Sequence, residues 1–364
     1  MNAFALADVF SGAGGLTLGF RESGFEPLLA VERHEDFAAT YAENFGTHVI
    51  VGAVEDVLKK GLPRRSIDVL VGGPPCQGFS SLTGNRASDP RRRLWEDYMA
   101  VLEGLDATVF VLENVPNFLR SEEGSRLIER ASSLGYVVED DTAAILNAAD
   151  YGVPQSRKRA VVVGSRIGKI RLPEPTTIRR SVRDAFMLGC WTNDSRIPPE
   201  PFGVELGRGP LTGPELHLGR NPTAVSRARY RAVPPGGNRF DLARKRPDLT
   251  PECWRRKKSG STDVFGRLRW ERPSVTIRTE FFKPEKGRYL HPAEDRPITH
   301  WEALRLQSFP DSFRWCGSKI AIAAQIGNAV PPLLAKALAR EIEEVLRRSR
   351  RWQDASVRRR RGAA

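Results

Sequence analysis

Short apolar runs alternate with amphipathic helical patterns over the first 165 residues of the chain. The runs that predict buried strands lie at residues 5–10, 27–31, 49–51, 67–71, 108–112 and 160–163. Helices are predicted between them at residues 15–23, 34–44, 94–105 and 124–134. This alternation predicts an α/β fold with right-handed crossovers and a mostly parallel sheet covered on both faces. Ligand-binding residues then belong at the carboxyl ends of the strands.

After Arg166 the pattern changes. Proline and glycine recur, and no long helical period returns before residues 299–307 and 333–346. We therefore predict a second, irregular domain of strands and loops, about a hundred residues long. The boundaries expected from the sequence are 1–175 completed by 320–346 for the first domain, 176–300 for the second, 301–319 for a hinge and 347–364 for a disordered basic tail.

The composition limits the class of protein. At 364 residues the chain can hold a catalytic domain and a smaller one. No apolar run approaches the length of a membrane span, and no basic region precedes the short apolar stretch at the start, so we expect a soluble cytoplasmic protein. The cysteines Cys76, Cys190, Cys253 and Cys316 are widely spaced, which predicts reduced thiols and no structural metal.

The formal charge of +13 is concentrated in two segments. Residues 220–271 contain 14 Lys or Arg against 5 Asp or Glu, and residues 347–364 contain 8 Arg against 1 Asp. Concentrated positive charge is what binding a polyanion requires, and for the first segment it favours phosphate contact over a solvated surface. For residues 347–364, a solvated chain end and a segment that binds DNA are equally good interpretations.

Cys76 lies in residues 72–80, GGPPCQGFS, directly after a predicted buried strand. Glycine allows a sharp turn and proline fixes φ, so the loop is stiff and presents the thiol. A lone cysteine is more often a small buried hydrophobe, so the loop by itself leaves both interpretations open.

Three charged residues follow or precede other predicted strands. Glu113 follows the strand at 108–112, where a capping or salt-bridged acid is the alternative interpretation. Arg157 and Arg159 alternate on an extended segment and so point the same way, with phosphate contact or a solvated edge as the alternative.

Residues 8–15, DVFSGAGG, supply a strand, a glycine-rich turn and the start of a helix. Glu32 ends the next strand 24 residues after Asp8, about where a ribose-binding carboxylate belongs. The glycines are spaced GxGG instead of GxGxxG, which favours a ligand without a pyrophosphate.

The motif GGPPCQGFS, together with ENV at 113–115 and QSRKR at 155–159, resembles the cytosine-5 DNA methyltransferase family. Further matches are the turn at 8–15, RPSVTIR at 272–278 and QIGNAVPP at 325–332, so only residues 167–271 lack a family motif. The resemblance places the variable target-reading region there. It implies a Rossmann-like domain that uses S-adenosylmethionine and a smaller, irregular, β-rich target-recognition domain.

The resemblance also implies a division of chemical roles. Cys76 would attack carbon 6 of a cytosine flipped out of the duplex, so that carbon 5 can accept a methyl group. Glu113 would meet ring nitrogen 3, Arg157 would contact the target base, and Arg159 would support the site.

Cofactor and DNA contacts follow from the same matches. The residues implied for S-adenosylmethionine are Phe10, Ser11, Gly12, Gly14, Glu32, Val54, Pro75, Leu94, Asn328 and Val330. Leu94 is equally readable as ordinary helix core, and Ala53 stands where the family usually has an aspartate for the adenine amino group. The residues expected to contact DNA are Gln77, Ser80, Arg239, Arg255 and Arg256.

The leading hypothesis is a sequence-specific DNA cytosine-5 methyltransferase, monomeric and nucleoid-associated in a bacterial cytoplasm. It would act on double-stranded DNA, either paired with a separate restriction endonuclease or alone. The alternatives are a tRNA cytosine-5 methyltransferase and a catalytically inactive DNA-binding regulator. The basic region favours duplex DNA over tRNA, and the intact Cys76, Glu113 and Arg157 argue against an inactive regulator.

Overall fold

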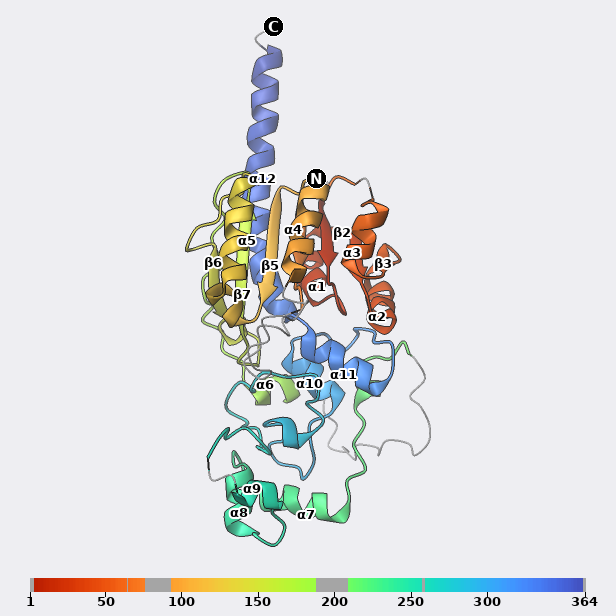
Figure 1. Cartoon of the computed structure of the whole chain (residues 1–364), viewed down its shortest axis with the longest axis vertical. Coiled ribbons are helices and arrows are strands. Elements are labelled where there is room, and N and C mark those ends of the chain that lie inside the picture. Colours follow the sequence, from red (N-terminus) through yellow and green to blue (C-terminus); the bar gives the residue numbers. More distant parts are fainter. Residues whose placement is uncertain (1–2, 64, 76–92, 188–208, 257–258, 363–364) are drawn as a thin grey trace. The chain divides into compact units, whose positions relative to one another are not determined.

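The computed structural model describes residues 3–63, 65–75, 93–187, 209–256 and 259–362, with side chains as far as Arg351. The chain forms two compact units (Figure 1). The first unit comprises Met1–Tyr151, Lys158–Thr176 and Val330–Ala364, and the second comprises Gly152–Arg157 and Thr177–Ala329. These boundaries differ from the expected ones, because residues 320–329 and the expected hinge at 301–319 both belong to the second unit.

A sheet forms the centre of the first unit. Its strands within the described residues are β1 (Phe4–Val9), β2 (Phe25–Glu32), β3 (Val49–Val51), β4 (Val69–Gly72), β5 (Val109–Asn114), β6 (Ala143–Asn147) and β7 (Lys158–Ser165). Their order is β3-β2-β1-β4-β5-β7-β6. Strands β1 to β5 pair in parallel, and β7 is antiparallel to β5 and β6, so the predicted mostly parallel sheet is confirmed. Strand β6 was not predicted because its half-exposed residues form no buried apolar run.

Helices cover both faces of this sheet, as continuously buried strands require. The helices of the first unit are α1 (Gly15–Arg21), α2 (Glu35–Phe45), α3 (Val54–Lys60), α4 (Leu94–Leu105), α5 (Glu122–Ser133) and α12 (Pro332–Gly362). The large apolar core joins α3, α4 and α5 to the sheet. In Figure 1, α4 and α5 lie in front of the sheet and α12 lies behind it. Helix α1 packs against α12 so closely that a Cβ on Gly19 would lie 2.5 Å from the backbone nitrogen of Lys336.

Helix α12 extends well beyond the predicted residues 333–346. Its backbone is helical to Gly362, which corrects the expectation of a disordered tail at 347–364. Ion pairs one turn apart, Glu343 with Arg347 and Glu344 with Arg348, support the helix where its apolar face ends. No single helix in the described residues has both the length and the apolar composition of a membrane span, although α11 (Lys319–Asn328) and α12 together reach them.

The second unit is built from short helices and loops. Its helices are α6 (Val182–Met187), α7 (Ala224–Ala232), α8 (Arg239–Lys245), α9 (Glu252–Arg256), α10 (His300–Leu306) and α11 (Lys319–Asn328). The expectation of a β-rich domain is wrong for the described part of this unit, which contains isolated β-bridges instead of strands. Two N-caps explain part of the difference: Thr223 begins α7, and Asn238 forms a capping box with Asp241 at the start of α8.

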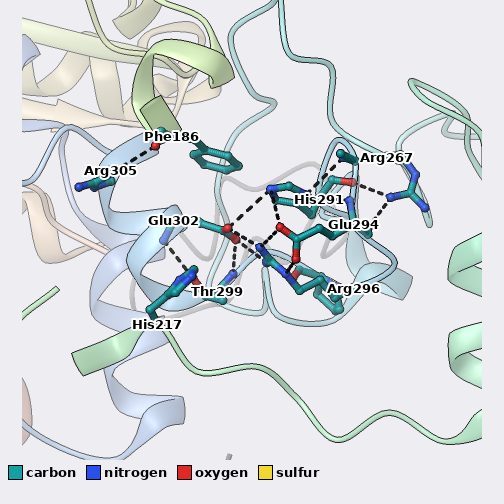
Figure 2. Close-up of polar contacts among 11 residues, drawn as sticks. Phe186, His217, Arg267, His291, Glu294, Arg296, Thr299, Glu302 and Arg305 are labelled. Atoms are coloured by element: carbon teal, nitrogen blue, oxygen red, sulfur yellow. Dashed lines mark hydrogen bonds and ion pairs between the residues drawn. The ribbon is translucent and has the colours of Figure 1, made fainter. Parts of the chain in front are cut away.

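A buried ion network organises the second unit (Figure 2). Glu302 is fully buried, and both of its carboxylate oxygens accept hydrogen bonds from Arg296, at 2.7 and 2.8 Å. Burial alone would raise the pKa of Glu302, but the Arg296 guanidinium and the backbone N–H of Thr299 lower it to about 2. Glu294 pairs with Arg296 from the other side, at 2.7 Å.

Arg267 ties the loops around this network together. Its buried guanidinium donates to the backbone oxygens of Tyr230, Val233, His291 and Glu294, at 2.5 to 2.9 Å. A guanidinium has five N–H donors in a fixed plane and can therefore connect the last turn of α7, which contains Tyr230, to carbonyls that belong to no regular strand or helix. This bonding substitutes for the ladder hydrogen bonds that the described part of the unit lacks.

Substituting Glu302 tests the network. Glu302→Gln leaves the Arg296 charge buried without its full counter-charge, so we expect a loss of about 3–5 kcal/mol of unfolding free energy at pH 7. Because the pKa of Glu302 is lowered on folding, its contribution is present above the unfolded value of 4.5 and is lost as the pH falls through about 2. Urea denaturation at several pH values measures both effects.

Glu252→Gln is the matched control, since Glu252 forms an exposed pair with Arg256. We expect that change to cost no more than about 1 kcal/mol. Equal losses in the two variants would contradict a special role for the buried network.

Candidate active site

The turn after β1 adopts a backbone conformation that favours glycine. Phe10, Gly12 and Gly14 all have positive φ, at 58°, 56° and 89°. A Cβ on Gly14 would also lie 2.3 Å from a ring carbon of Phe45, so glycine is required there by space as well as by φ. A phenylalanine at positive φ is an outlier of the kind found at functional sites.

Glu32, the last residue of β2, fixes this turn. Its Oε2 accepts a hydrogen bond from the Gly12 backbone nitrogen at 2.8 Å, and its Oε1 accepts one from the His34 nitrogen, also at 2.8 Å. The side chain is buried. Two backbone N–H groups therefore hold one carboxylate beside the turn, and each oxygen keeps a lone pair for a further donor.

Two buried polar atoms at the turn have no hydrogen-bond partner within the described residues. They are the hydroxyl oxygen of Ser11 and the Oδ1 atom of Asp8. Buried polar atoms are nearly always paired, so these two mark a place where a polar ligand or water completes the bonding. The turn and the Glu32 carboxylate thus fit a polar small molecule such as a nucleoside.

Asp8 also begins a chain of hydrogen bonds. Its Oδ2 accepts from the Thr17 hydroxyl at 2.6 Å, Thr17 lies 3.2 Å from the Tyr41 hydroxyl, and Tyr41 lies 3.3 Å from His48 Nε2. Burial raises the pKa of Asp8, the Thr17 hydroxyl opposes this rise and the neighbouring Glu32 adds to it, so that the pKa is about 7. Asp8 therefore changes its charge near neutral pH.

The other residues expected to hold a cofactor are divided between the units. Val54 begins α3 and is buried, Leu94 begins α4 and is half-buried, and Val330 is buried in the first unit. Pro75 is half-buried in the loop after β4. Asn328 is exposed and belongs to the second unit. Their role as cofactor contacts stays a prediction.

The loop that leads to Cys76 is held beside Glu113. The Asn114 side-chain nitrogen donates to the carbonyl of Pro74 at 3.1 Å, and the Asn114 Oδ1 accepts from the Val115 nitrogen. A Cβ on Gly73 would lie 3.0 Å from Glu113 Oε2. The start of the loop and the carboxylate are therefore in near contact, while Cys76, Gln77 and Ser80 lie outside the described residues.

Arg159 is the charged partner of Glu113. Arg159 Nε lies 2.7 Å from Glu113 Oε1, and the two side chains are 15% and 10% exposed. The antiparallel pairing of β5 and β7 brings them together, because Glu113 is opposite Val161, two residues from Arg159. A carboxylate and a guanidinium thus share one largely buried position at the end of β5.

Arg157 lies in the second unit and is buried differently. Its guanidinium donates to the backbone oxygens of Ile277 and Asn328, at 3.1 and 3.3 Å, and the residue is 2% exposed. It therefore connects the three motif segments at 155–159, 272–278 and 325–332. This is a structural position, and it differs from the base-facing position expected for Arg157.

Two buried glutamines form further hydrogen bonds between the segments that Arg157 connects. Gln155 accepts from the Ile277 nitrogen at 2.8 Å and donates to the Gln307 side-chain oxygen at 2.7 Å. Gln307 in turn donates to the backbone oxygen of Ile326. Gln307 lies outside the sequence motifs and directly follows α10, so the sequence gives no signal that its side chain is buried.

The described candidates for DNA contact differ in exposure. Arg239 is buried and donates to the Ser259 carbonyl at 2.8 Å, which differs from the DNA-facing position expected for it. Arg255 and Arg256 are exposed on α9, where Arg256 pairs with Glu252 at 2.8 Å. Exposed pairs of this kind are weak and can be exchanged for a phosphate.

Comparison with known proteins identifies a family whose sequence pattern the chain matches. The model of the C-5 cytosine-specific DNA methylase family matches residues 4–185 and 225–344. The type II methyltransferase M1.HphI of Haemophilus parahaemolyticus is 35% identical over 348 residues, which cover 92% of this chain and 85% of the relative. The type II methyltransferase M.XorII of Xanthomonas oryzae pv. oryzae is also 35% identical, over 382 residues that cover 94% of this chain and 85% of the relative.

A solved structure supports the fold. The crystal structure of a DNA modification methyltransferase encoded within an E. coli prophage matches with a TM-score of 0.71 and 24% identity, covering 95% of this chain and all of that one. The Rossmann-like α/β fold predicted from the sequence is therefore confirmed.

The raised pKa of Asp8 generates a prediction about pH. The pKa of Asp8 is about 7 in the folded protein, above the usual 3.8 of an aspartate, so protonation of Asp8 stabilises the fold. That contribution is complete below about pH 4 and is lost as the pH rises through 7. Asp8→Asn keeps an acceptor for Thr17 but cannot ionise. We expect the unfolding free energy of the variant to fall less between pH 5 and 8 than that of the unchanged protein.

Urea denaturation at each pH measures the difference, and Asp36→Asn, half-buried in the first turn of α2, serves as the control. Parallel pH profiles for the unchanged protein and Asp8→Asn would rule out titration of Asp8 in this range.

Proposed function

The chain belongs to the family of C-5 cytosine-specific DNA methylases and is a DNA cytosine-5 methyltransferase, and from this premise we propose how its residues divide the reaction. The observation that best supports the proposal is the near contact between the loop of Gly73 and the Glu113 carboxylate. Arg159 forms an ion pair with the same carboxylate. Cys76 follows three residues after Gly73. The loop that leads to the proposed nucleophile and the proposed acid thus follow neighbouring strands of one sheet.

Carbon 5 of cytosine is a poor nucleophile because the ring is aromatic and electron-poor. The Cys76 thiolate forms a bond to carbon 6, and the electron pair of the 5,6 double bond becomes available at carbon 5. After methylation, loss of the carbon 5 proton restores the double bond and expels the thiolate. Sulfur suits both steps, being a strong nucleophile and a good leaving group.

Addition at carbon 6 shifts negative charge to ring nitrogen 3 and the carbonyl oxygen at carbon 2. Glu113 meets nitrogen 3 as the proton donor. We assign the carbonyl oxygen to Arg159, because that oxygen is adjacent to nitrogen 3 and Arg159 is the cation that touches Glu113. Arg157, committed to the Ile277 and Asn328 carbonyls, takes the supporting role, so the two arginines exchange the roles expected from the sequence.

The glycine-rich turn is proposed to hold S-adenosylmethionine. Glu32 would accept from the ribose hydroxyls through its remaining lone pairs, and the unpartnered Ser11 hydroxyl fits a polar group of the same ligand. Phe10 and Val54 would supply apolar contact to the ligand, and Pro75, Leu94, Val330 and Asn328 complete the proposed set. When bound, S-adenosylmethionine supplies the electrophilic sulfonium methyl group.

Duplex DNA is the proposed substrate, with the target cytosine flipped out of the stack. The second unit would read the sequence, and its exposed Arg255 and Arg256 are the described candidates for DNA contact. The stretch that the family model leaves unmatched, residues 186–224, falls in the region expected to vary between targets. Since the relatives are type II methyltransferases, we propose that a separate endonuclease shares the recognition sequence.

Substituting the thiol tests the covalent step. We expect Cys76→Ser to abolish methyl transfer to duplex DNA while its affinity for that DNA stays within about twofold, because a hydroxyl is a far weaker nucleophile than a thiolate. Labelled S-adenosylmethionine measures transfer, and the same assay with tRNA controls for the substrate. Label entering tRNA and not DNA would end the proposal.

Duplex DNA with 5-fluorocytosine at the target provides the second readout. Fluorine cannot leave as a cation, so the unchanged protein should form an adduct that survives denaturation, and Cys76→Ser should form none. An adduct of equal yield in Cys76→Ser would assign the bond to another residue.

Glu113 and Arg159 can be tested together. We expect Glu113→Gln to lower kcat about 10²–10⁴-fold at nearly unchanged KM, because the lost proton donor acts mainly in the transition state. Arg159→Lys should also lower kcat, by a smaller factor, since it keeps the charge and loses the planar donor. Glu122→Gln, on the exposed start of α5, is the matched control. A kcat for Glu113→Gln equal to that of the control would exclude an acid at this position.

A further inference from the structure

Tyr98, in the second turn of α4, joins two strands of the sheet through its hydroxyl group. The side chain is fully buried. Its hydroxyl donates to the carbonyl oxygens of Leu70 and Val111, at 3.1 and 3.0 Å, so the two carbonyls share one proton. Leu70 belongs to β4 and Val111 belongs to β5. One side chain from the helix layer therefore connects the two strands in addition to their own pairing.

The ring of Tyr98 also limits the position of Gly72, the last residue of β4. A Cβ on Gly72 would lie 2.9 Å from a carbon of this ring and 2.6 Å from the carbonyl oxygen of Val9. The backbone at Gly72 is thus enclosed between β1 and α4, and a larger residue would fit there only if the strand moved. Tyr98 therefore contacts both the middle and the end of β4.

The contacts of Tyr98 lie close to the two positions that we propose for the chemistry. Gly73, where the loop after β4 begins, is three residues after Leu70. Glu113 is two residues after Val111. At about 3.3 Å per residue, these intervals are roughly 10 and 7 Å. The two strands are therefore joined shortly before the point at which Gly73 and Glu113 come into near contact.

Tyr98 also lies near both ends of the segment that carries Cys76. This segment leaves the sheet after Gly72, and α4 begins at Leu94, one turn before Tyr98. Because Tyr98 contacts Gly72, the end of the segment is fixed relative to its start. A segment with fixed ends has fewer accessible conformations, so this contact also limits where the thiol can lie.

We propose that Tyr98 is a positioning residue for methyl transfer, an inference that rests on the proposed function. Its hydroxyl joins β4 to β5 and so holds Gly73 and Glu113 at a separation that lets one cytosine ring meet both the thiol and the acid. Tyr98 acts through the two strands and not on the substrate. A displacement of about 1 Å between reacting groups can lower the rate about 10²-fold, so a bond this close to the site affects the reaction.

The hydroxyl of Tyr98 keeps its proton in the folded protein. Burial holds the pKa of Tyr98 well above its usual range, and the neighbouring Tyr136 and Asp8 raise it further, against the lowering effect of the bond to Val111. The hydroxyl therefore remains a hydrogen-bond donor at every pH at which the enzyme is assayed. Its loss should change the rate of the reaction and leave the pH dependence of that rate unchanged.

Tyr136 provides a matched control. It is also buried, and its hydroxyl donates to the Ala107 carbonyl. Both tyrosine rings pack edge-on against Phe110. Ala107, however, precedes β5 and lies at the opposite end of that strand from Glu113. Tyr136→Phe therefore removes a similar buried bond to the same part of the sheet, away from the candidate active site.

The test compares Tyr98→Phe with Tyr136→Phe in the full-length protein, using labelled S-adenosylmethionine and a long unmethylated duplex. We expect Tyr98→Phe to lower kcat about 10–100-fold at nearly unchanged KM for both substrates, because the reacting groups are displaced. Tyr136→Phe should keep kcat within about twofold of the unchanged protein. Both variants should lower the melting temperature by a similar amount, about 2–4 °C, since each loses one buried hydrogen bond.

The rate of adduct formation is the second readout. A duplex copied with 5-fluorocytosine in place of cytosine, together with S-adenosylmethionine, reports the bond from Cys76 to carbon 6. This rate should fall in Tyr98→Phe by about the same factor as kcat. The shape of the profile of kcat against pH, between about pH 6 and 9, should match that of the unchanged protein. A purely structural role would lower the melting temperature and leave the adduct rate unchanged.

Equal kcat values and equal adduct rates for the two Tyr→Phe variants would overturn this inference alone. An altered pH profile for Tyr98→Phe would also overturn it, because the hydroxyl would then take part in proton transfer. If the unchanged protein transfers no methyl group to the duplex, the proposed function fails as well, so the two failures are distinguishable.

Discussion

The parallel register of four neighbouring strands is the constraint on which the candidate site depends. Val9 of β1 is paired with both Val31 and Gly72, and Gly72 is paired with Leu112. The residue after each of these positions is part of the site: Phe10 opens the glycine-rich turn, and Glu32, Gly73 and Glu113 follow on the other three strands. A slip of one residue in any strand would turn its functional side chain to the opposite face of the sheet.

The strands can keep this register because they are buried on both faces. Strands β4 and β5 are buried along their whole length, so their apolar side chains leave no alternative pairing that covers as much surface. The same burial makes the carboxylates at their ends costly unless each has a partner. Backbone N–H groups supply this for Glu32, Arg159 supplies it for Glu113 and Thr17 supplies it for Asp8.

Much of the first unit could be predicted from the sequence, because its signals are local. The runs at 67–71 and 108–112 correspond to β4 and β5, and the turn at 8–15 precedes α1 as expected. The partners of Arg157 and Arg159 could not be predicted, because alternation along a strand says nothing about which residues lie across from them. Glu113 reaches Arg159 only through the pairing of β5 with β7, and Arg157 reaches Ile277 across 120 positions of sequence.

The second unit shows a different limit of prediction. Its prolines and glycines correctly indicated irregular chain, but they did not indicate what would hold that chain together. The structure uses buried side chains, above all Arg267 with its four carbonyl partners and Gln155 with Gln307. A buried arginine that donates to backbone carbonyls leaves no periodic pattern in the sequence, so it cannot be distinguished there from an exposed arginine.

The contacts of α12 have a consequence for how the first unit folds. Gly19 of α1 packs against Lys336, and Ala5 shares Asp68 with Arg350, which is 282 positions from Asp68 in the sequence. The sheet therefore lacks the cover of α12 until these distant segments meet, and closing so long a loop makes that step slow. A folding intermediate in which α12 has not yet docked exposes apolar surface and is therefore prone to aggregate.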